Sequence, residues 1–261
     1  MDYAIYKTGQ TINRILENQN FIANNIANIS TPGFKEKFIS VLSCTKQKQS
    51  NQQGQKDFLV TNKKEYINTS IGFFKNTGRS LDLAISKENY WFIVKRKKNS
   101  KTKYFTRNGG IKLNKNNELT ILNNFLIGTN NNIITIPKDS NVTVEKDGTI
   151  YCCKNKSLYT FKKKIGKIAI KYIKNDNIIT SKYGNLYLEN IQKNNTNNKK
   201  LFYSNSRNLI LSGTIEESNV SPTTSIINMI SNAREFEMNL KLITYCNENQ
   251  KIANHFMNIN Y

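Results

Sequence analysis

Apolar residues near the start of the chain recur at alternating intervals of three and four. With Thr8 and Gln19 completing the spacing, the stripe consists of isoleucines: Ile5, Ile12, Ile15, Ile22, Ile26 and Ile29. This heptad pattern predicts a helix with one apolar seam. At Ser30-Thr31-Pro32-Gly33 the residue before proline favours extended geometry and glycine permits a positive φ. We therefore predict a helix from about residue 3 to residue 28.

Beyond this helix the apolar period becomes that of strands. Residues 36–70 are polar, and residues 47–54 predict an exposed connection. Short apolar or alternating runs follow at residues 81–85, 91–94, 119–121, 133–136, 142–144, 168–170 and 186–188. Turn residues occur at Asn108-Gly109 and Tyr183-Gly184-Asn185, and Asp147-Gly148 between Val144 and Ile150 predicts a hairpin. The middle of the chain is therefore an all-β domain without βαβ units.

A second helical pattern begins at Ser221-Pro222, where serine can cap the helix and proline suits its first position. The apolar residues again step by three and four: Ile226, Met229, Ala233, Phe236, Leu240 and Ile243. The predicted fold is a mainly β central domain flanked by long N- and C-terminal α-helices that form a coiled-coil-like core. The expected divisions are 1–35 for the first helix and its motif, 36–75 for a linker, 76–212 for the β-rich domain and 213–261 for the second helix.

Two apolar stripes at opposite ends of the chain need cover. Narrow heptad stripes are typical of coiled-coil seams, whereas a helix packed on a globular core shows a broader apolar face. An antiparallel hairpin of the two helices within one molecule and assembly with other molecules both satisfy the pattern. The residues alone leave these alternatives open.

Composition adds a basic charge to this picture. The chain has 261 residues, 39 Lys plus Arg against 18 Asp plus Glu, and a net charge of +21. Such a charge suggests a polyanion-binding module, but the excess is scattered lysine with few arginines, and arginine is the residue that forks onto bases and phosphates. We interpret the charge as a solvated surface shaped by a biased codon usage, and we predict no nucleic-acid partner.

Catalytic and metal chemistry is not predicted. The single histidine, His255, cannot form a multi-histidine site, and Cys44, Cys152, Cys153 and Cys246 lack zinc-type spacing, so we interpret the cysteines as packing residues. Glu216 and Glu217 precede a helix start, where the helix dipole favours negative charge, so we interpret them as structural. Glycine-rich nucleotide motifs are missing, and we predict no enzyme activity, no cofactor and no metal.

The sequence also predicts no membrane insertion and no cleaved signal peptide. No run approaches the ~18 apolar residues that a membrane helix needs. The first residues lack a basic start followed by an apolar run and a small-residue cleavage site. Any export therefore uses another route.

Four blocks carry a resemblance to a known family. Residues 22–35, IANNIANISTPGFK, resemble the N-terminal signature of flagellar basal-body rod and hook proteins. Residues 81–85 with 91–94 resemble the first core strands of that family, residues 105–109 (FTRNG) its Y-T-R-x-G block, and residues 212–220 (SGTIEESNV) the stretch that opens its C-terminal helix. Residues 1–6 and 230–238 are most similar to proximal-rod subunits, and a distal-rod or hook-type axial protein is the alternative.

The resemblance implies a structural subunit of the flagellar basal body, located in the periplasmic rod and passed through the flagellar type III export apparatus without a cleaved signal. Its implied partners are copies of itself and other rod proteins. The resemblance also favours assembly over a hairpin within one molecule, and in that assembly both terminal helices pack into the wall of a helical tube. Departures from the family pattern, such as Lys87-Glu88-Asn89-Tyr90-Trp91 before the second strand, put surface loops in doubt.

The motif residues have physical roles that agree with assembly. Polar side chains at the edge of an apolar seam can set its register, and small residues let a neighbouring helix approach. Glycine turns the chain, and the following phenylalanine anchors it. Asn219 and Ser221 are interpreted as helix caps. The expected assembly surface comprises Ile12, Ile15, Ile22, Asn24, Asn25, Ile26, Ala27, Asn28, Gly33, Phe34, Ser218, Asn219, Val220, Ile226, Met229, Ala233, Phe236 and Leu240.

Overall fold

A computed structural model describes residues 2–45, 59–98, 100, 102–138, 140–154, 162–181, 184, 186–189 and 208–258. It separates into two compact units. The first contains Met1–Ala27, Lys37–Lys64 and Ser221–Tyr261, and the second contains Asn28–Glu36 and Glu65–Val220. The expected connection at residues 47–54 and the turn residues Tyr183 and Asn185 lie outside the described residues.

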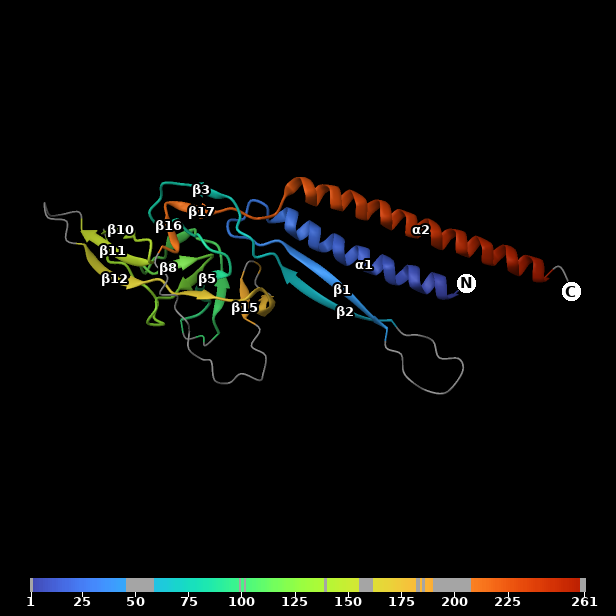
Figure 1. Ribbon diagram of the computed structural model, residues 1–261, viewed down its shortest axis with the longest axis horizontal. Helices are drawn as coiled ribbons and strands as arrows, with labels where there is room; N and C mark the ends of the chain where they lie inside the picture. Colours follow the sequence, from blue (N-terminus) through green and yellow to red (C-terminus); the bar gives the residue numbers. More distant parts are fainter. Residues whose placement is uncertain are drawn as a thin grey trace. The chain divides into compact units, whose positions relative to one another are not determined.

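The first unit is a pair of helices with a short sheet. Helix α1 (Asp2–Ala27) and helix α2 (Pro222–Asn258) run side by side in Figure 1, and strands β1 (Lys37–Thr45) and β2 (Leu59–Ile67) form a two-stranded sheet. Arg14 of α1 contacts Glu235 of α2, and Asn18 contacts Asn232, so the residue numbers run in opposite directions and the helices are antiparallel. Extrapolating these pairings places the start of α1 beside about residue 248 of α2. The last turns of α2 extend beyond α1.

Both predicted helices are confirmed with their boundaries nearly as expected. Helix α1 ends at Ala27, one residue before the predicted end. Helix α2 begins at Pro222, and the Oγ of Ser221 accepts a hydrogen bond from the N–H of Thr224 at 3.4 Å. Ser221 is therefore the N-cap that the sequence predicts.

The second unit consists of short strands. Their bounds are β3 (Phe74–Asn76), β4 (Leu83–Ile85), β5 (Tyr90–Lys95), β6 (Tyr104–Thr106), β7 (Ile111–Leu113), β8 (Leu119–Ile121), β9 (Asn124–Leu126), β10 (Ser140–Val144), β11 (Thr149–Lys154), β12 (Lys163–Lys167), β13 (Ile170–Tyr172), β14 (Ile178–Thr180), β15 (Tyr187–Glu189), β16 (Ile210–Ser212) and β17 (Thr214–Glu216), with a 3-10 turn at Asn175–Asn177.

The largest sheet has the order β14-β15-β6-β5-β9-β8-β7, and β13 also pairs with β5. A three-stranded sheet has the order β10-β11-β12, and β16 pairs with β4 and β17 with β3. The fold class is confirmed: the two terminal helices pack together and flank a central, mainly β region.

Strand β5 lies between two hydrophobic clusters. Phe92 and Val94 belong to one cluster, while Trp91 and Ile93 belong to the other. All four are buried, as expected for side chains that alternate across a strand covered on both faces. The continuous apolar run at 91–94 is therefore explained by burial on both sides. Cys152 joins the first cluster, and Cys152, Cys153 and Cys246 carry no disulfide.

The predicted hairpin at Asp147-Gly148 is confirmed. Strands β10 and β11 pair antiparallel with Val144 opposite Ile150, and Gly148 has φ of 88°. The predicted strand at 133–136 is wrong. That segment forms only isolated bridges, Ile127 with Ile133 and Glu118 with Thr135. Its backbone hydrogen bonds go to different neighbouring segments, so no single strand pairs with it along its length.

Candidate assembly surface

The seam of α1 is the least exposed side of that helix. Ile15 is 2% exposed and Ile22 is 8% exposed, while Ile12 and Ile26 are half-buried. This side is covered within the helix unit, as the heptad spacing predicts. Whether any of these residues also touches another subunit stays a prediction.

The seam of α2 differs from the predicted stripe. Met229, Ala233 and Phe236 are half-buried, but Ile226 is 51% exposed and Leu240 is 43% exposed. The least exposed positions instead step by four and three through polar residues as well: Ser225, Met229, Asn232, Phe236, Asn239, Ile243 and Cys246. The prediction followed apolar residues alone, and the packing side of the helix lies to one side of that stripe.

A second set of apolar side chains lies roughly opposite this seam, about half a turn round the helix at ~100° per residue. We call it the outer face of α2. Its members are between 49% and 66% exposed: Ile227, Ile230, Met238, Tyr245, Ile252 and Phe256. Arg234 and Lys241 are also exposed on this side of the helix, and large apolar side chains gathered in this way are typical of an interaction surface.

Asn25 holds the chain after α1 by its side-chain amide. Its Oδ1 accepts from the N–H of Lys37 at 3.0 Å, and its Nδ2 donates to the carbonyl of Lys37 at 2.8 Å. The buried amide therefore sets register within its own chain, where the sequence suggested register with a partner. Asn24 and Ala27 are exposed on α1.

The turn after α1 is built as its residue types suggest. Asn28 accepts a backbone bond from Thr31 at 3.1 Å. Gly33 has φ of 68°, and a Cβ there would lie 2.3 Å from the carbonyl carbon of Arg107. Phe34 is completely buried. Gly33 therefore turns the chain and Phe34 anchors it, as the sequence suggested, and both residues lie inside the β unit.

This turn delivers Lys35 to a buried ion cluster with Glu216 and Arg107, which we call the Glu216 cluster. The Nζ of Lys35 lies 2.6 Å from Oε1 of Glu216, and Nη2 of Arg107 lies 2.7 Å from Oε2. All three side chains are almost completely buried. The interpretation of Glu216 as a helix-dipole residue is wrong: it is the interior counter-ion of two cations.

Both carboxylate oxygens of Glu216 accept hydrogen bonds. Oε1 also accepts the N–H of Gly72 at 3.0 Å, and Oε2 accepts Nε of Arg107 at 2.8 Å. The remaining donors of Arg107 reach the carbonyls of Ile85, Lys87 and Tyr90. A buried ion pair stabilises a fold only when its hydrogen bonds are complete, and this one meets that condition.

The cluster also changes the titration of its members. Burial lowers the pKa of Lys35, an effect that the carboxylate of Glu216 opposes and the nearby Arg107 reinforces. Burial likewise lowers the pKa of Arg107. The hydroxyl of Tyr187 accepts the N–H of Lys35 at 3.2 Å, and burial raises the pKa of this phenol well above its usual range.

Asn219 is a tertiary anchor, so its interpretation as a helix cap is wrong. Its Oδ1 accepts the N–H of Glu36 at 2.8 Å, and its Nδ2 donates to the carbonyl of Asn68 at 2.9 Å. Its neighbours Ser218 and Val220 are buried, and Ser218 Oγ accepts the N–H of Val220 at 3.2 Å. Asn219 therefore connects this segment by hydrogen bonds to the turn at residues 30–36.

Three of the family-like blocks therefore meet at one point in the β unit. Lys35 comes from the first, Arg107 from the FTRNG block and Glu216 from the block before α2. The sequence patterns assigned no role to Lys35 or Arg107 and only a helix-dipole role to Glu216. The available signal was charge: Lys35 and Arg107 are each the single charged side chain of their block, and Glu216, one of two carboxylates in its block, has the opposite sign.

Among the residues that the structure describes, no group of three or more His, Cys, Asp or Glu side chains could hold a metal ion. His255 is exposed on the last turns of α2. In the same residues, no helix is long and apolar enough to cross a membrane.

Comparison with known proteins places the chain in a class. Residues 11–35 match the family model described as flagella basal body rod protein, and residues 211–255 match that of the flagellar basal body rod FlgEFG protein C-terminal. A protein of Buchnera aphidicola subsp. Schizaphis graminum is 40% identical over 260 residues, covering 100% of both chains. The chain therefore belongs to the flagellar basal-body rod protein family.

Within this family the similar full-length relatives carry one name. The Buchnera relative is named flagellar basal-body rod protein FlgF, and so is a Salmonella typhimurium protein that is 28% identical over 259 residues, 99% of this chain and 100% of the relative. A protein of Buchnera aphidicola subsp. Baizongia pistaciae named FlgG is 27% identical over 255 residues, 92% of this chain and 93% of the relative.

Proposed function

We propose that the chain is a non-enzymatic structural subunit of the flagellar basal-body rod, of the FlgF type that forms its proximal part. Its contacts with copies of itself and with other rod proteins are made by the terminal helices. The observation that carries this proposal is the outer face of α2, where six large apolar side chains stand about half to two-thirds exposed.

The energetics of this face favour a partner. Covering a half-exposed side chain of this size contributes about 1 kcal/mol, so burial of the set would favour association. Two of its members, Ile252 and Phe256, lie where α2 extends past α1. A helix that overhangs its own partner offers that stretch to another molecule.

Assembly geometry follows from where such a face lies. The outer face occurs once per chain and has no counterpart of similar apolar content on α1, whose exposed large apolar residues in the described part are Tyr6 and Leu16. Contacts between unlike surfaces produce a helical array when they do not close into a ring, and such an array suits an axial tube. Long helices that lie along the axis of such a wall would share torsional load across many subunits.

The proposed location is the periplasmic rod of the basal body, reached through the flagellar type III export apparatus. Support comes from the family membership. Helices that complete their packing only in the rod would also limit premature polymerisation before export.

The direct test is the composition of basal bodies. Rods would be purified from flagellated cells that make the full-length chain and from cells that lack it. We expect the chain in the rod fraction and a truncated or absent rod in the cells without it. Intact rods in those cells would refute the proposed function.

A distal-rod or hook-type role is the second candidate. The FlgG relative matches almost the full length, although at 27% identity against 40% for a FlgF relative. Labelled chain at the distal end of the rod would favour this alternative. A polyanion-binding role requires affinity for DNA that falls steeply with salt, because phosphate contacts release counterions.

A further inference from the structure

Phe73 is the most exposed large apolar side chain in the described part of the chain, at 84%. It directly precedes β3, which pairs antiparallel with β17 so that Phe74 lies opposite Glu216. Successive side chains of a strand point to opposite sides, so Phe74 lies on the side of the buried Glu216 and Phe73 lies on the other. The ring of Phe73 is therefore not covered by its own chain.

The backbone holds Phe73 in a fixed position despite this exposure. The carbonyl of Phe73 accepts the N–H of Glu217 at 2.8 Å, and the N–H of Gly72 donates to Oε1 of Glu216 at 3.0 Å. A Cβ at Gly72 would lie 2.1 Å from the carbonyl oxygen of Glu217, so glycine is needed for this close approach. An aromatic side chain on a backbone that is fixed before binding loses little conformational entropy on association, and such residues often dominate interfaces.

Two charges of opposite sign lie beside Phe73. The side chains of Lys75 and Glu217 are 66% and 47% exposed, and Nζ of Lys75 lies 3.7 Å from Oε1 of Glu217. An exposed ion pair of this length contributes little stability, so either residue can pair with another molecule at small cost. We call Phe73, Lys75 and Glu217 the Phe73 site. A surface that receives this site must offer apolar side chains together with charges of both signs.

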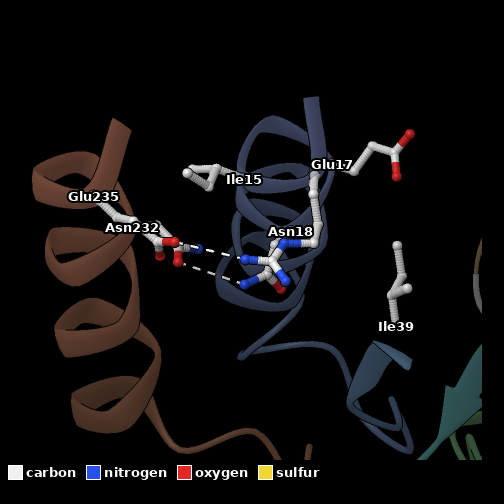
Figure 2. A pocket seen from close by; sticks show the side chains of 7 residues that line it. Ile15, Glu17, Asn18, Ile39, Asn232 and Glu235 are labelled. Atoms are coloured by element: carbon white, nitrogen blue, oxygen red, sulfur yellow. Dashed lines mark hydrogen bonds and ion pairs between the residues drawn. The ribbon is translucent and has the colours of Figure 1, made fainter. Parts of the chain in front are cut away.

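The charged residues of α2 divide between two sides of the helix. Figure 2 shows the covered side, where Asn232 and Glu235 point toward α1, and Glu235 pairs there with Arg14 at 3.6 Å. Arg234 and Glu237 are exposed instead, and neither forms an ion pair among the described residues. Their charges are therefore available to another molecule.

Arg234 lies between two apolar members of the outer face of α2. Ile230 precedes it by four residues and Met238 follows it by four, so the three side chains share one side of the helix. Ile230 and Met238 are both exposed, and Glu237 lies at the edge of this stretch. The outer face therefore offers the apolar surface and the two opposite charges that the Phe73 site requires.

We propose that Phe73 packs against the outer face of α2 in a second copy of the chain, between Ile230 and Met238. Glu217 pairs with Arg234 of that copy. Both surfaces are exposed in the same chain, so neither covers the other within one molecule. Complementary charges fix the register of the contact, which an apolar face alone leaves free to slide, and the unlike surfaces let the contact repeat from copy to copy. The proposal rests on the proposed function and identifies the surface that the outer face contacts.

The first experiment removes the ring. Phe73→Ala, the unchanged chain and Tyr172→Ala, which alters an exposed aromatic residue of β13, would be made at full length in flagellated cells lacking the protein. We expect Phe73→Ala to be depleted from purified rods by about tenfold or more, because an aromatic anchor is lost. Its midpoint of urea unfolding should be unchanged, because the ring is exposed in the single chain. Tyr172→Ala should enter rods like the unchanged chain.

The second experiment exchanges the paired charges. Glu217→Arg and Arg234→Glu should each deplete the chain from rods by about fivefold, and the chain with both changes should return to within about twofold of the unchanged level, because the ion pair is rebuilt with its signs reversed. The control combines Glu217→Arg with Lys112→Glu. Lys112 is exposed on β7, so this chain restores only the net charge and should stay depleted.

The third experiment identifies the occupant directly. The photo-cross-linking residue p-benzoylphenylalanine would replace Phe73, where it keeps an aromatic ring at the position, or Tyr172 as the control. Irradiated rods should give an adduct from position 73 to α2 of a second copy and no such adduct from position 172. An adduct from position 73 only to α1 or to a different rod protein, or no adduct, would overturn the proposed occupant.

The outcomes separate this contact from the proposed function. Incorporation of Phe73→Ala at the unchanged level would overturn the contact and leave the proposed function standing. Failure of the double charge variant to recover, or recovery of the Lys112→Glu control, would overturn the pairing of Glu217 with Arg234 in the same way. Absence of the unchanged chain from rods would overturn both the contact and the proposed function.

Discussion

The β unit and the helix unit differ in where their charged groups lie, because the β unit buries an ion cluster whereas the ion pair between α1 and α2 is exposed. In the β unit, the buried carboxylate of Glu216 accepts hydrogen bonds from Lys35, from Gly72 and from Nε of Arg107, and Nη2 of Arg107 forms an ion pair with it at 2.7 Å. Buried polar atoms without a partner occur in both units among the described residues: Nδ2 of Asn232 in the helix unit, and Oδ1 of Asn89, Nε1 of Trp91 and Oε2 of Glu118 in the β unit. The feature that points to contacts with other molecules is therefore the exposed outer face of α2.

Removal of the buried carboxylate should have the largest effect on folding. Glu216→Gln leaves Lys35 and Arg107 as buried cations without a counter-ion, and breaking one partner of such a cluster costs about 3–5 kcal/mol in free energy of unfolding. Urea unfolding of the full chain measures it. Glu217→Gln is the matched control, because Glu217 pairs with Lys75 at the surface and should change stability by less than about 1 kcal/mol. Equal effects would contradict the buried role of Glu216.

Gly33→Ala should rank second. The added Cβ meets the backbone of Arg107 at 2.3 Å, and the φ of 68° is strained for any other residue. We expect a loss of about 2–4 kcal/mol, since backbone cannot move aside as a flexible side chain can. Gly9→Ala in α1 has nothing within 4 Å of the new Cβ, and alanine there should stabilise the helix by about 1 kcal/mol. Thermal unfolding of both variants tests the pair.

Tyr187 provides a pH-dependent test of the β unit. Its pKa is raised by burial, an effect that the N–H of Lys35 opposes and the charge of Glu216 reinforces. The pKa of a tyrosine in the unfolded chain is about 10, and here the folded pKa is higher. The free energy of unfolding is therefore unaffected by this group below about pH 10 and falls as the pH rises above that value, because the unfolded chain loses the proton first.

Tyr187→Phe should therefore remove part of the alkaline fall in stability above about pH 10, at a cost of about 1 kcal/mol at neutral pH for the lost hydroxyl. Urea unfolding at a series of pH values measures both effects, and comparison of the two chains cancels the titration of Lys35. An unchanged alkaline slope would show that Tyr187 ionises equally well in the folded chain.

Substitution on the outer face of α2 should have the smallest effect on folding. Met238→Glu and Tyr245→Glu replace side chains that are 59% and 61% exposed, so stability should change by less than about 0.5 kcal/mol. Assembly into rods should nevertheless be lost, because a carboxylate cannot be buried unpaired against an apolar partner. Phe236→Glu, at the half-buried seam, should destabilise the helix pair as well. Normal rod incorporation of both outer-face variants would exclude this face from the interface.

Sequence patterns were informative wherever one physical requirement decided the residue type. The isoleucine spacing predicted α1 within one residue at its end, Ser221-Pro222 predicted the start of α2, and Asp147-Gly148 predicted a hairpin. The segment 133–136 failed because an apolar run predicts burial, and a continuous strand also needs a partner along its whole length. The stripe on α2 was misplaced because Ser225, Asn232 and Asn239 are polar members of its packing side.

The sequence by itself determined the helices, the β-rich middle and the family to which the chain belongs, because local spacing, capping and turn chemistry act over a few neighbouring residues. Only the tertiary structure decided that Lys35, Arg107 and Glu216 form one buried cluster, since residues far apart in the chain must be brought together to reveal their pairing. It also decided which side of α2 is covered by α1 and which is exposed. Burial is a property of the folded surroundings, and no single stretch of residues contains it.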